Sequence, residues 1–321
     1  MLPPGGTGRR PKGAPVSTPG RPACERSPGG TGTGHEAAPS LPMPKGAPVT
    51  RTLAVCADDF GWAVATSNGI ARLAHARRLT AIACITNGPH WDGLAPLLEG
   101  LPDTVDIGLH LNFTEGRPLS ARLARRWPRA PGLLRLIVQA HLGLLPHAAV
   151  RREVHQQLGA FTHAVGKPPA FIDGHQHVHH LPGVREIVLD MAEHLQPLPA
   201  VRNTGRVLGP GHALKRGLIE RTGGRGLARD LESRVLAHNP ALLGVYDFRT
   251  TDYRALMQGW LAALPPEGAL LFCHPGDASP GRAADPIAEA RVREIAYLES
   301  AAFDVDLAAA DVRLGRVWQT R

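Results

Sequence analysis

The stretch TLAVCADDFGWAVATSNGIARLAHARRLTAIACIT, residues 52–86, decides the fold class. Its two ends, 52–57 and 81–86, are apolar runs of the length of a buried strand. Between them, residues 67–78 have the apolar spacing of a helix that buries one face. A strand, a helix and a second strand in this order predict a βαβ unit with parallel strands.

The same alternation of strands and helices continues along the chain. Further strands are expected at 105–112, 171–176, 199–202, 269–274 and 312–317. Further helices are expected at 94–99, 132–165, 184–195, 252–263 and 284–300. The pattern predicts an α/β fold, either a barrel or an open parallel sheet, with helices outside and function at the carboxyl ends of the strands.

Residues 1–50 differ in composition from the rest of the chain. They are rich in Gly, Pro, Ser and Thr and have almost no large apolar side chain, which predicts a disordered and dispensable segment before a folded domain at 51–321. The six residues PKGAPV occur twice, at 11–16 and 44–49, which suggests the hypothesis that Met43 is the true start. Since we find no apolar signal-peptide core and no run of about 18 apolar residues, we expect a cytoplasmic protein.

Charge and cysteine content exclude some functions. The net charge is +8, and residues 1–50 contribute +4 of it, from six Lys or Arg and two Glu. Aromatic residues make up 5% of the chain and do not alternate with a basic helix, so nucleic acid is not expected as a partner. The four cysteines form no CxxC pair and are expected to be buried thiols: Cys24, Cys56, Cys84 and Cys273.

Acidic and imidazole side chains stand at the ends of four predicted strands. They are Asp58 and Asp59 after the first strand, His110 in the third, Asp173 and His175 in the strand at 171–176, and His274 at the end of 269–274. Because the carboxyl ends of parallel strands meet at one edge, we expect these groups to converge on a single site.

A run of histidines follows the strand predicted at 171–176. The sequence FIDGHQHVHH, residues 171–180, holds four: His175, His177, His179 and His180. Strand alternation would place Asp173 and the first imidazoles on one face. Two alternatives stay open: an exposed tract that binds metal adventitiously, or histidines that pack and hydrogen-bond among themselves.

One carboxylate and two imidazoles leave open positions on a divalent ion for water and substrate, and Asp59, His110 and His175 fit that need. Because neighbouring side chains of an extended chain point apart, Asp58 is expected beside this group, as a general base on metal-bound water. The alternative role of Asp58 is to form a turn.

His274 is a candidate acid for a leaving amine, and its alternative role is packing. The imidazoles favour Zn²⁺, while the carboxylate and retained waters allow Mg²⁺.

Four motifs, in this order and spacing, resemble the YdjC-like carbohydrate deacetylases, which include the chitooligosaccharide deacetylases. The motifs are ADDFG at 57–61, GLHLNFTEG at 108–116, DGHQHVHH at 173–180 and CHPG at 273–276. The resemblance covers about Leu53 to Ser300. It implies a distorted (β/α) barrel that removes N-acetyl groups from amino sugars with one divalent metal ion, usually Mg²⁺.

The resemblance also implies roles for single residues. Carried over by motif, the metal ligands are Asp59, His110 and His175, the base is Asp58, and the substrate or acid contact is His274. Asp173 would orient a ligand imidazole, Arg291 would pair with an acid near the site, and His177 and His179 would contact substrate or support the ligands. His180 has no implied role.

The NFTEG and QHVHH motifs and GVYDF at 244–248 are similar to the hopanoid-biosynthesis branch of this family. That likeness implies N-acetylglucosamine linked to a hopanoid lipid as the substrate. The alternatives are a chitooligosaccharide or other small acetylated sugar and, in another class, a non-catalytic metal- or sugar-binding barrel.

One feature independent of the family favours a lipid-linked substrate. Residues 116–152 hold eight arginines and no Asp or Glu, around the apolar run GLLRLIVQAHLGLL. Such a segment predicts peripheral contact with a membrane, here the inner face of the cytoplasmic membrane. The alternative is a helix packed on the barrel with solvated arginines. Assembly into a homo-oligomer stays open.

Overall fold

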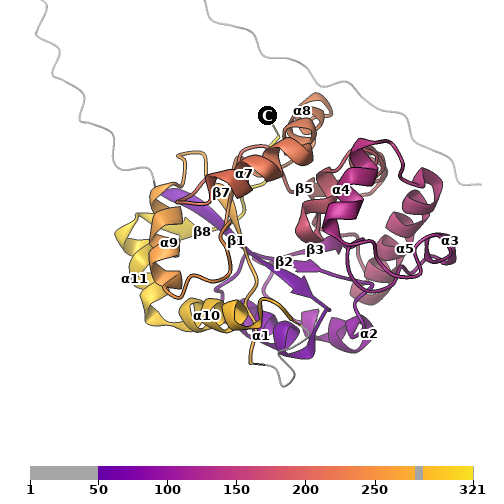
Figure 1. Cartoon of the computed structure of the whole chain (residues 1–321). Coiled ribbons are helices and arrows are strands. Elements are labelled where there is room, and N and C mark those ends of the chain that lie inside the picture. The colour runs from indigo at the N-terminus through magenta and orange to yellow at the C-terminus, as the bar shows by residue number, and fades with distance from the viewer. Residues whose placement is uncertain (1–49, 279–284, 321) are drawn as a thin grey trace, which may run out of the picture. The chain divides into compact units, whose positions relative to one another are not determined.

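A single sheet of parallel strands forms the centre of the molecule (Figure 1). The computed structural model describes residues 50–278 and 285–320. In that part of the chain the strand order is β5-β4-β3-β2-β1-β7-β6, and β8 pairs with the start of β1. The strands are β1 (Arg51–Phe60), β2 (Ala81–Cys84), β3 (Asp106–Leu111), β4 (Phe171–Gly174), β5 (Ala200–Val201), β6 (Leu242–Leu243), β7 (Ala269–Cys273) and β8 (Val312–Leu314).

Irregular segments close the sheet between its outer strands, β5 and β6. The Val201 amide of β5 donates to the Ala237 carbonyl over 2.9 Å, and the Leu208 amide donates to the Leu242 carbonyl of β6 over 2.9 Å. The sheet is therefore curled into a distorted barrel, which confirms the predicted α/β class and decides between the two architectures that the pattern allowed.

Helices surround the strands (Figure 1). They are α1 (Val64–His75), α2 (Trp91–Leu94), α3 (Ala121–Ala124), α4 (Leu133–His141), α5 (His147–Val165), α6 (Arg185–Ala192), α7 (Ala213–Ile219), α8 (Arg225–Ser233), α9 (Tyr253–Ala262), α10 (Ala288–Glu299) and α11 (Ala301–Ala309). Short 3-10 turns form η1 (Ala95–Leu98) and η2 (His175–His180), and a π-turn forms η3 (Glu220–Gly224). None of the helices in the described ranges is both long and apolar enough to cross a bilayer.

Several predicted elements have different bounds in the structure. The helix expected at 132–165 is two helices, because Gly143 takes a left-handed φ of 68° and Pro146 precedes the first residue of α5. The helix expected at 94–99 is the 3-10 turn η1, preceded by α2. The sequence prediction missed α3, α7, α8, α11 and β6. The predictions for residues 1–49 lie outside the described residues.

The strands have apolar side chains on both faces. Leu53, Val55 and Ala57 of β1 belong to the larger core between sheet and helices. Ala54 and Cys56 belong to a smaller core with Ala81, Ala83 and Phe272, on the other face of the sheet. Small side chains in this inner core leave room for polar groups at the carboxyl ends of the strands.

Candidate metal and catalytic site

The end of β1 presents two carboxylates to one cavity. Alternation along the strand places Asp58 on the inner face, two residues after Cys56. Asp59 has a left-handed φ of 72°, and the pairing with β2 shifts register between Ala57 and Phe60. Because this bulge interrupts the alternation, both carboxylates line the cavity, of about 340 Å³.

Asp59, His110 and His175 form a group in which one donor atom from each lies within 4.8 Å of the others. Asp59 Oδ1 is 2.9 Å from His175 Nδ1 and 3.6 Å from His110 Nε2. Its other oxygen, Oδ2, accepts a hydrogen bond of 2.8 Å from Arg291 of α10. The two imidazoles thus share one carboxylate oxygen, and this donor set fits a divalent cation that keeps open positions.

The pKa values in this group are set by its charges. Burial raises the pKa of Asp59, but His175 and Arg291 outweigh burial and hold that pKa well below its usual range. Burial lowers the pKa of His175, but Asp59 outweighs it and raises the pKa to about 10.

Asp173 holds the His110 ring from behind. Its Oδ1 lies 2.6 Å from His110 Nδ1, and both side chains are buried. A hydrogen bond at Nδ1 leaves Nε2 as the free donor atom, on the side of Asp59.

A buried guanidinium, Arg202, lies at the centre of the inner core. Its Nη1 and Nη2 donate to the two oxygens of Asp58 over 2.7 and 2.6 Å, and Nη2 lies 2.5 Å from Asp173 Oδ2. Burial raises the pKa of Asp58, but Arg202 brings it below its usual value, so the carboxyl is ionised at neutral pH. Cys56, Asp58 and Asp173 are close enough together for a second metal group, but the guanidinium occupies that place.

Sequence reasoning missed Arg202, although a signal was present. It is the last residue of the short strand predicted at 199–202 and directly follows β5 in the structure, so it stands at a strand end, as Asp58 and His110 do.

His274 follows β7 on another side of the cavity. Its ring meets Phe248 and Phe272 edge-on, with ring centroids 5.2 and 5.6 Å away. Burial lowers the pKa of His274 to about 4, so the imidazole is neutral at pH 7. The His274 backbone amide donates to Glu294 Oε2 over 2.5 Å, and the Tyr246 hydroxyl donates to the other oxygen of Glu294.

The histidine run does not continue the strand. β4 ends at Gly174, and the left-handed φ values of Gln176 (53°) and His177 (62°) turn the chain into η2. The expected alternation of imidazoles on one face is therefore wrong, because it requires extended backbone. The close approach of Gly174 to the turn explains part of this, since a Cβ there would lie 2.8 Å from the His179 amide nitrogen.

The four histidines have separate environments. His175 approaches Asp59, and His177 lines the cavity with its ring 5.2 Å from that of Phe272. His179 Nε2 is 2.8 Å from the Arg202 carbonyl, and His180 Nδ1 is 2.8 Å from the Thr204 hydroxyl. Both of these imidazoles are buried, and their hydrogen bonds fix η2 against the segment after β5.

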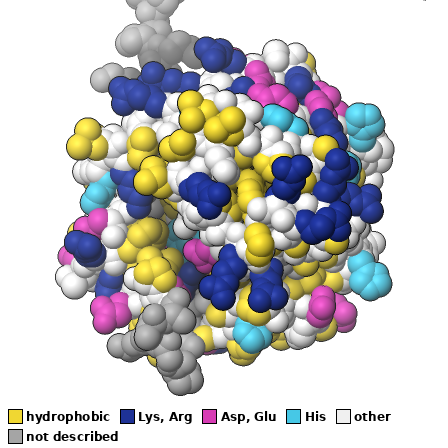
Figure 2. Space-filling model, turned by 45° about the vertical axis from the view of Figure 1, so that its right-hand side comes forward, with side chains coloured by type: hydrophobic (Ala, Val, Ile, Leu, Met, Phe, Trp, Pro, Cys, Tyr) yellow, Lys and Arg dark blue, Asp and Glu magenta, His cyan; other side chains and the backbone are white. Residues whose placement is uncertain are grey.

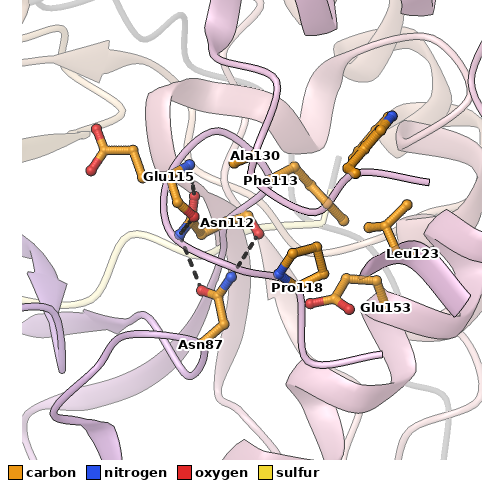
Figure 3. A pocket seen from close by; sticks show the side chains of 9 residues that line it. Asn87, Asn112, Phe113, Glu115, Pro118, Leu123, Ala130 and Glu153 are labelled. Atoms are coloured by element: carbon orange, nitrogen blue, oxygen red, sulfur yellow. Dashed lines mark hydrogen bonds between the residues drawn. The ribbon is translucent and has the colours of Figure 1, made fainter. Parts of the chain in front are cut away.

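The loop after β3 contributes a carboxylate that sequence reasoning did not single out. Asn112 Oδ1 accepts from the Glu115 amide, and Asn112 Nδ2 donates to Asn87 and to the Glu115 carbonyl (Figure 3). The loop is thereby fixed, and the Glu115 side chain points away from the small pocket of Figure 3. Its Oε1 lies 3.2 Å from His175 Nε2.

The sequence pattern of the family described as YdjC-like protein matches residues 52–309. A carbohydrate deacetylase of Xenopus laevis is 33% identical over 150 residues, which are 44% of this chain and 47% of that protein. A chitooligosaccharide deacetylase of Escherichia fergusonii is 32% identical over 149 residues, which are 44% of this chain and 56% of that protein. The chain spans about half the length of the curated relatives it matches.

A solved structure has a similar fold. It is a protein of Enterococcus faecalis V583, provisionally described as a cellobiose-phosphate cleavage protein, with a TM-score of 0.62 and 19% identity. The match covers 84% of this chain and 98% of that protein. At this identity the likeness concerns the fold alone.

Proposed function

The chain belongs to the YdjC-like protein family, and on that premise we propose that it is a metal-dependent hydrolase that removes the N-acetyl group of an acetylated amino sugar. One observation carries the proposal: the group Asp59, His110 and His175 shares a cavity with the ionised Asp58 and with His274. A site with ligands, a base and a second proton-transfer group suits amide hydrolysis better than mere binding.

A divalent ion held by Asp59, His110 and His175 would lower the pKa of water and polarise the acetyl carbonyl. The imidazole ligands favour Zn²⁺, and the family resemblance favours Mg²⁺. Asp173 would keep His110 in the ligating tautomer through its bond to Nδ1. Arg291 would hold Asp59 by the oxygen that the imidazoles do not use.

In this proposal Asp58 takes the proton of the attacking water. Arg202 keeps Asp58 ionised and fixes both of its oxygens, so the carboxylate is oriented before substrate arrives. His274 is neutral at pH 7 and holds no spare proton at rest. The proton that the leaving amine needs therefore comes from the water. It reaches the amine either from Asp58 or from His274, once that side chain has received the proton.

For the substrate we propose an N-acetylglucosamine-type sugar carried by a lipid, as in a glycosylated hopanoid, met at the inner face of the cytoplasmic membrane. The resemblance of the GVYDF motif to the hopanoid branch supports this proposal, and Tyr246 and Phe248 of the motif lie beside Glu294 and His274. A chitooligosaccharide or another small acetylated sugar is the alternative substrate, and the names of the curated relatives favour this alternative.

The test is acetate release from lipid-linked and free N-acetylglucosamine substrates, with and without a chelator. We expect acetate that disappears with the chelator and returns with the metal. Asp58→Asn should abolish turnover while metal stays bound, and His110→Ala should lose both, as measured by acetate assay and metal content. A protein that binds metal and sugar but releases no acetate from any substrate would instead be a non-catalytic binding barrel.

A further inference from the structure

Two helices far apart in the sequence border the mouth of the catalytic cavity. Leu133 of α4 lines the cavity, and so do Lys215, Leu218 and Ile219 of α7. The outward surfaces of these helices therefore lie next to the cavity that a substrate must enter.

The outward face of α4 is apolar. Leu134, Val138 and Leu142 are spaced by four residues, so they form one stripe along the helix and its end. Their exposed fractions are 77%, 47% and 65%. The opposite face already packs on the protein through Leu136 and Ala140, so the exposed stripe is a second apolar face.

The helix α7 lies at the surface of the molecule. It has no buried residue, and its Leu214 and Leu218 are 90% and 58% exposed. We call the five side chains of the two helices the apolar rim: Leu134, Val138, Leu142, Leu214 and Leu218. Large exposed apolar side chains on helices that line a cavity are typical of a docking site.

Exposed arginines occur in the same stretch of the chain as α4, and Arg135 lies on that helix. The eight arginines of residues 116–152 are all exposed, and that stretch contains no acidic residue. In the part of the chain that the structure describes, Arg151 alone among them is paired with an acid, Asp190. Figure 2 shows a face on which apolar side chains lie among Lys and Arg side chains.

We propose that the apolar rim inserts into the surface of an anionic lipid bilayer while the arginines bind its headgroups, so that the cavity opens toward the membrane. Charge complementarity favours a bilayer as the partner. The exposed leucines match its apolar interior, and the arginines, in a stretch without acidic residues, match its anionic surface. The docking itself is independent of the chemistry. The access of a lipid-linked sugar from the bilayer rests on the proposed function.

This surface differs from the membrane contact that the sequence predicts at 116–152. Ala149 and Val150 of that range are buried in the core, whereas α7 lies outside the range and supplies the most exposed leucine of the rim.

The test is sedimentation of the full chain with vesicles of phosphatidylcholine alone or with phosphatidylglycerol added. The rim variant is Leu134→Ser with Leu214→Ser. The control variant is Leu198→Ser with Val305→Ser, which removes two side chains that are 48% and 57% exposed outside the rim. All variants keep the basic residues 1–50, so binding through those residues would be equal in each.

We expect the unmodified chain to pellet with anionic vesicles and to be released by salt. The rim variant should lose about tenfold or more in partition coefficient, and the control variant should stay within about twofold. Equal binding by the two variants, or no binding by the unmodified chain, would overturn the proposal. A dimer of the unmodified chain that is absent in the rim variant, as measured by sedimentation velocity, would also overturn the proposal, since the rim would then bind a second copy.

Acetate release from a soluble N-acetylglucosamine oligomer, measured without vesicles on the same preparations, separates the two proposals. Vesicle binding without acetate release would support the membrane proposal and contradict the enzymatic function. Acetate release without vesicle binding would support the enzymatic function and contradict the membrane proposal.

Discussion

Asp58 and Asp59 are adjacent in sequence, yet their partners make them different groups. Arg202, 144 residues away, binds both oxygens of Asp58. Arg291, 232 residues away, binds one oxygen of Asp59 and leaves the other to two imidazoles. Asp58 is thus fixed through both oxygens by one guanidinium. Asp59 gives one oxygen to the Arg291 guanidinium and the other to the two imidazoles.

The histidine run offers the first prediction at this scale. His175→Ala should lose the bound metal, because His175 is one of three donors, whereas His179→Ala should keep it. The second variant should still lose about 1–3 kcal/mol of unfolding free energy, since it leaves the buried Arg202 carbonyl without its partner. Metal content and urea unfolding measure the two effects. Loss of metal from both variants would show that the run binds the ion collectively.

Glu294 predicts a pH dependence of stability. Burial raises its pKa from 4.5 to about 7. The folded state therefore holds this proton more tightly than the unfolded state does, so the contribution is full below about pH 4.5 and is lost as pH rises through 7. The loss is about 3 kcal/mol.

Urea unfolding at pH 5 and pH 8 tests this dependence. Glu294→Gln should reduce the difference between the two pH values, because the amide does not titrate. Glu99→Gln, at an exposed position, should leave the dependence as it is. An unchanged slope in Glu294→Gln would assign the dependence to other groups.

The residues of the site were partly predictable from sequence. The strand-end rule brought Asp59, His110 and His175 together, because the carboxyl ends of parallel strands meet at one edge. The strand-end rule applies equally to Arg202. A lone arginine after a two-residue strand belongs to no recognisable motif, so the sequence prediction did not include it. The Glu115 contact with His175 depends on how a loop folds back, and spacing does not encode that.

At the level of elements, the junction from β4 to η2 decides where the imidazoles point. The strand β4 ends at Gly174, and two successive left-handed residues, Gln176 and His177, turn the chain just after His175. Such backbone is costly for residues other than glycine, and it persists where the surroundings fix it. Here the bonds of His179 and His180 fix it.

Gly174→Ala should damage this junction. Its Cβ would lie 2.8 Å from the His179 amide nitrogen and 2.9 Å from the Val178 side chain. We expect a loss of about 1–3 kcal/mol in unfolding free energy, together with weaker metal binding, because His175 must move. The control is Gly159→Ala in α5, where nothing lies within 4 Å, and it should stabilise the helix by about 0.5–1 kcal/mol. Denaturant unfolding and metal titration measure both, and a neutral Gly174→Ala would show that the turn can shift freely.

Periodicity predicted the elements that bury a face and missed those that do not. The strands β1, β2, β3 and β7 and the helix α1 have clear apolar patterns. The helix α7 buries none of its side chains, so its sequence has no inward stripe to detect. β6 has two residues, too few for any pattern.

At the scale of the whole molecule, one guanidinium joins opposite parts of the barrel. Arg202 follows the outermost strand β5, and its partners lie in β4 and in β1, which is four strands away in the sheet order. Through Asp173 and His110 the same network reaches the ligand group. The base and the metal ligands are therefore parts of one buried set of charges.

Arg202→Met should destabilise the barrel by about 3–5 kcal/mol, because it leaves Asp58 and Asp173 buried without a cation. Arg151→Met, which breaks an ion pair with exposed side chains, should cost less than about 1 kcal/mol. Guanidinium unfolding of both variants is the measurement. Equal losses would mean that Arg202 is replaceable by packing.

The pairing of β1 also has a consequence for synthesis. Two of its partners, β7 and β8, begin more than 200 residues later, at Ala269 and Val312. The first strand to leave the ribosome therefore lacks those neighbours until nearly the whole chain has emerged, and closing so long a loop is slow. During translation the apolar edge of β1 is open to chaperones, and the barrel becomes complete only at the end.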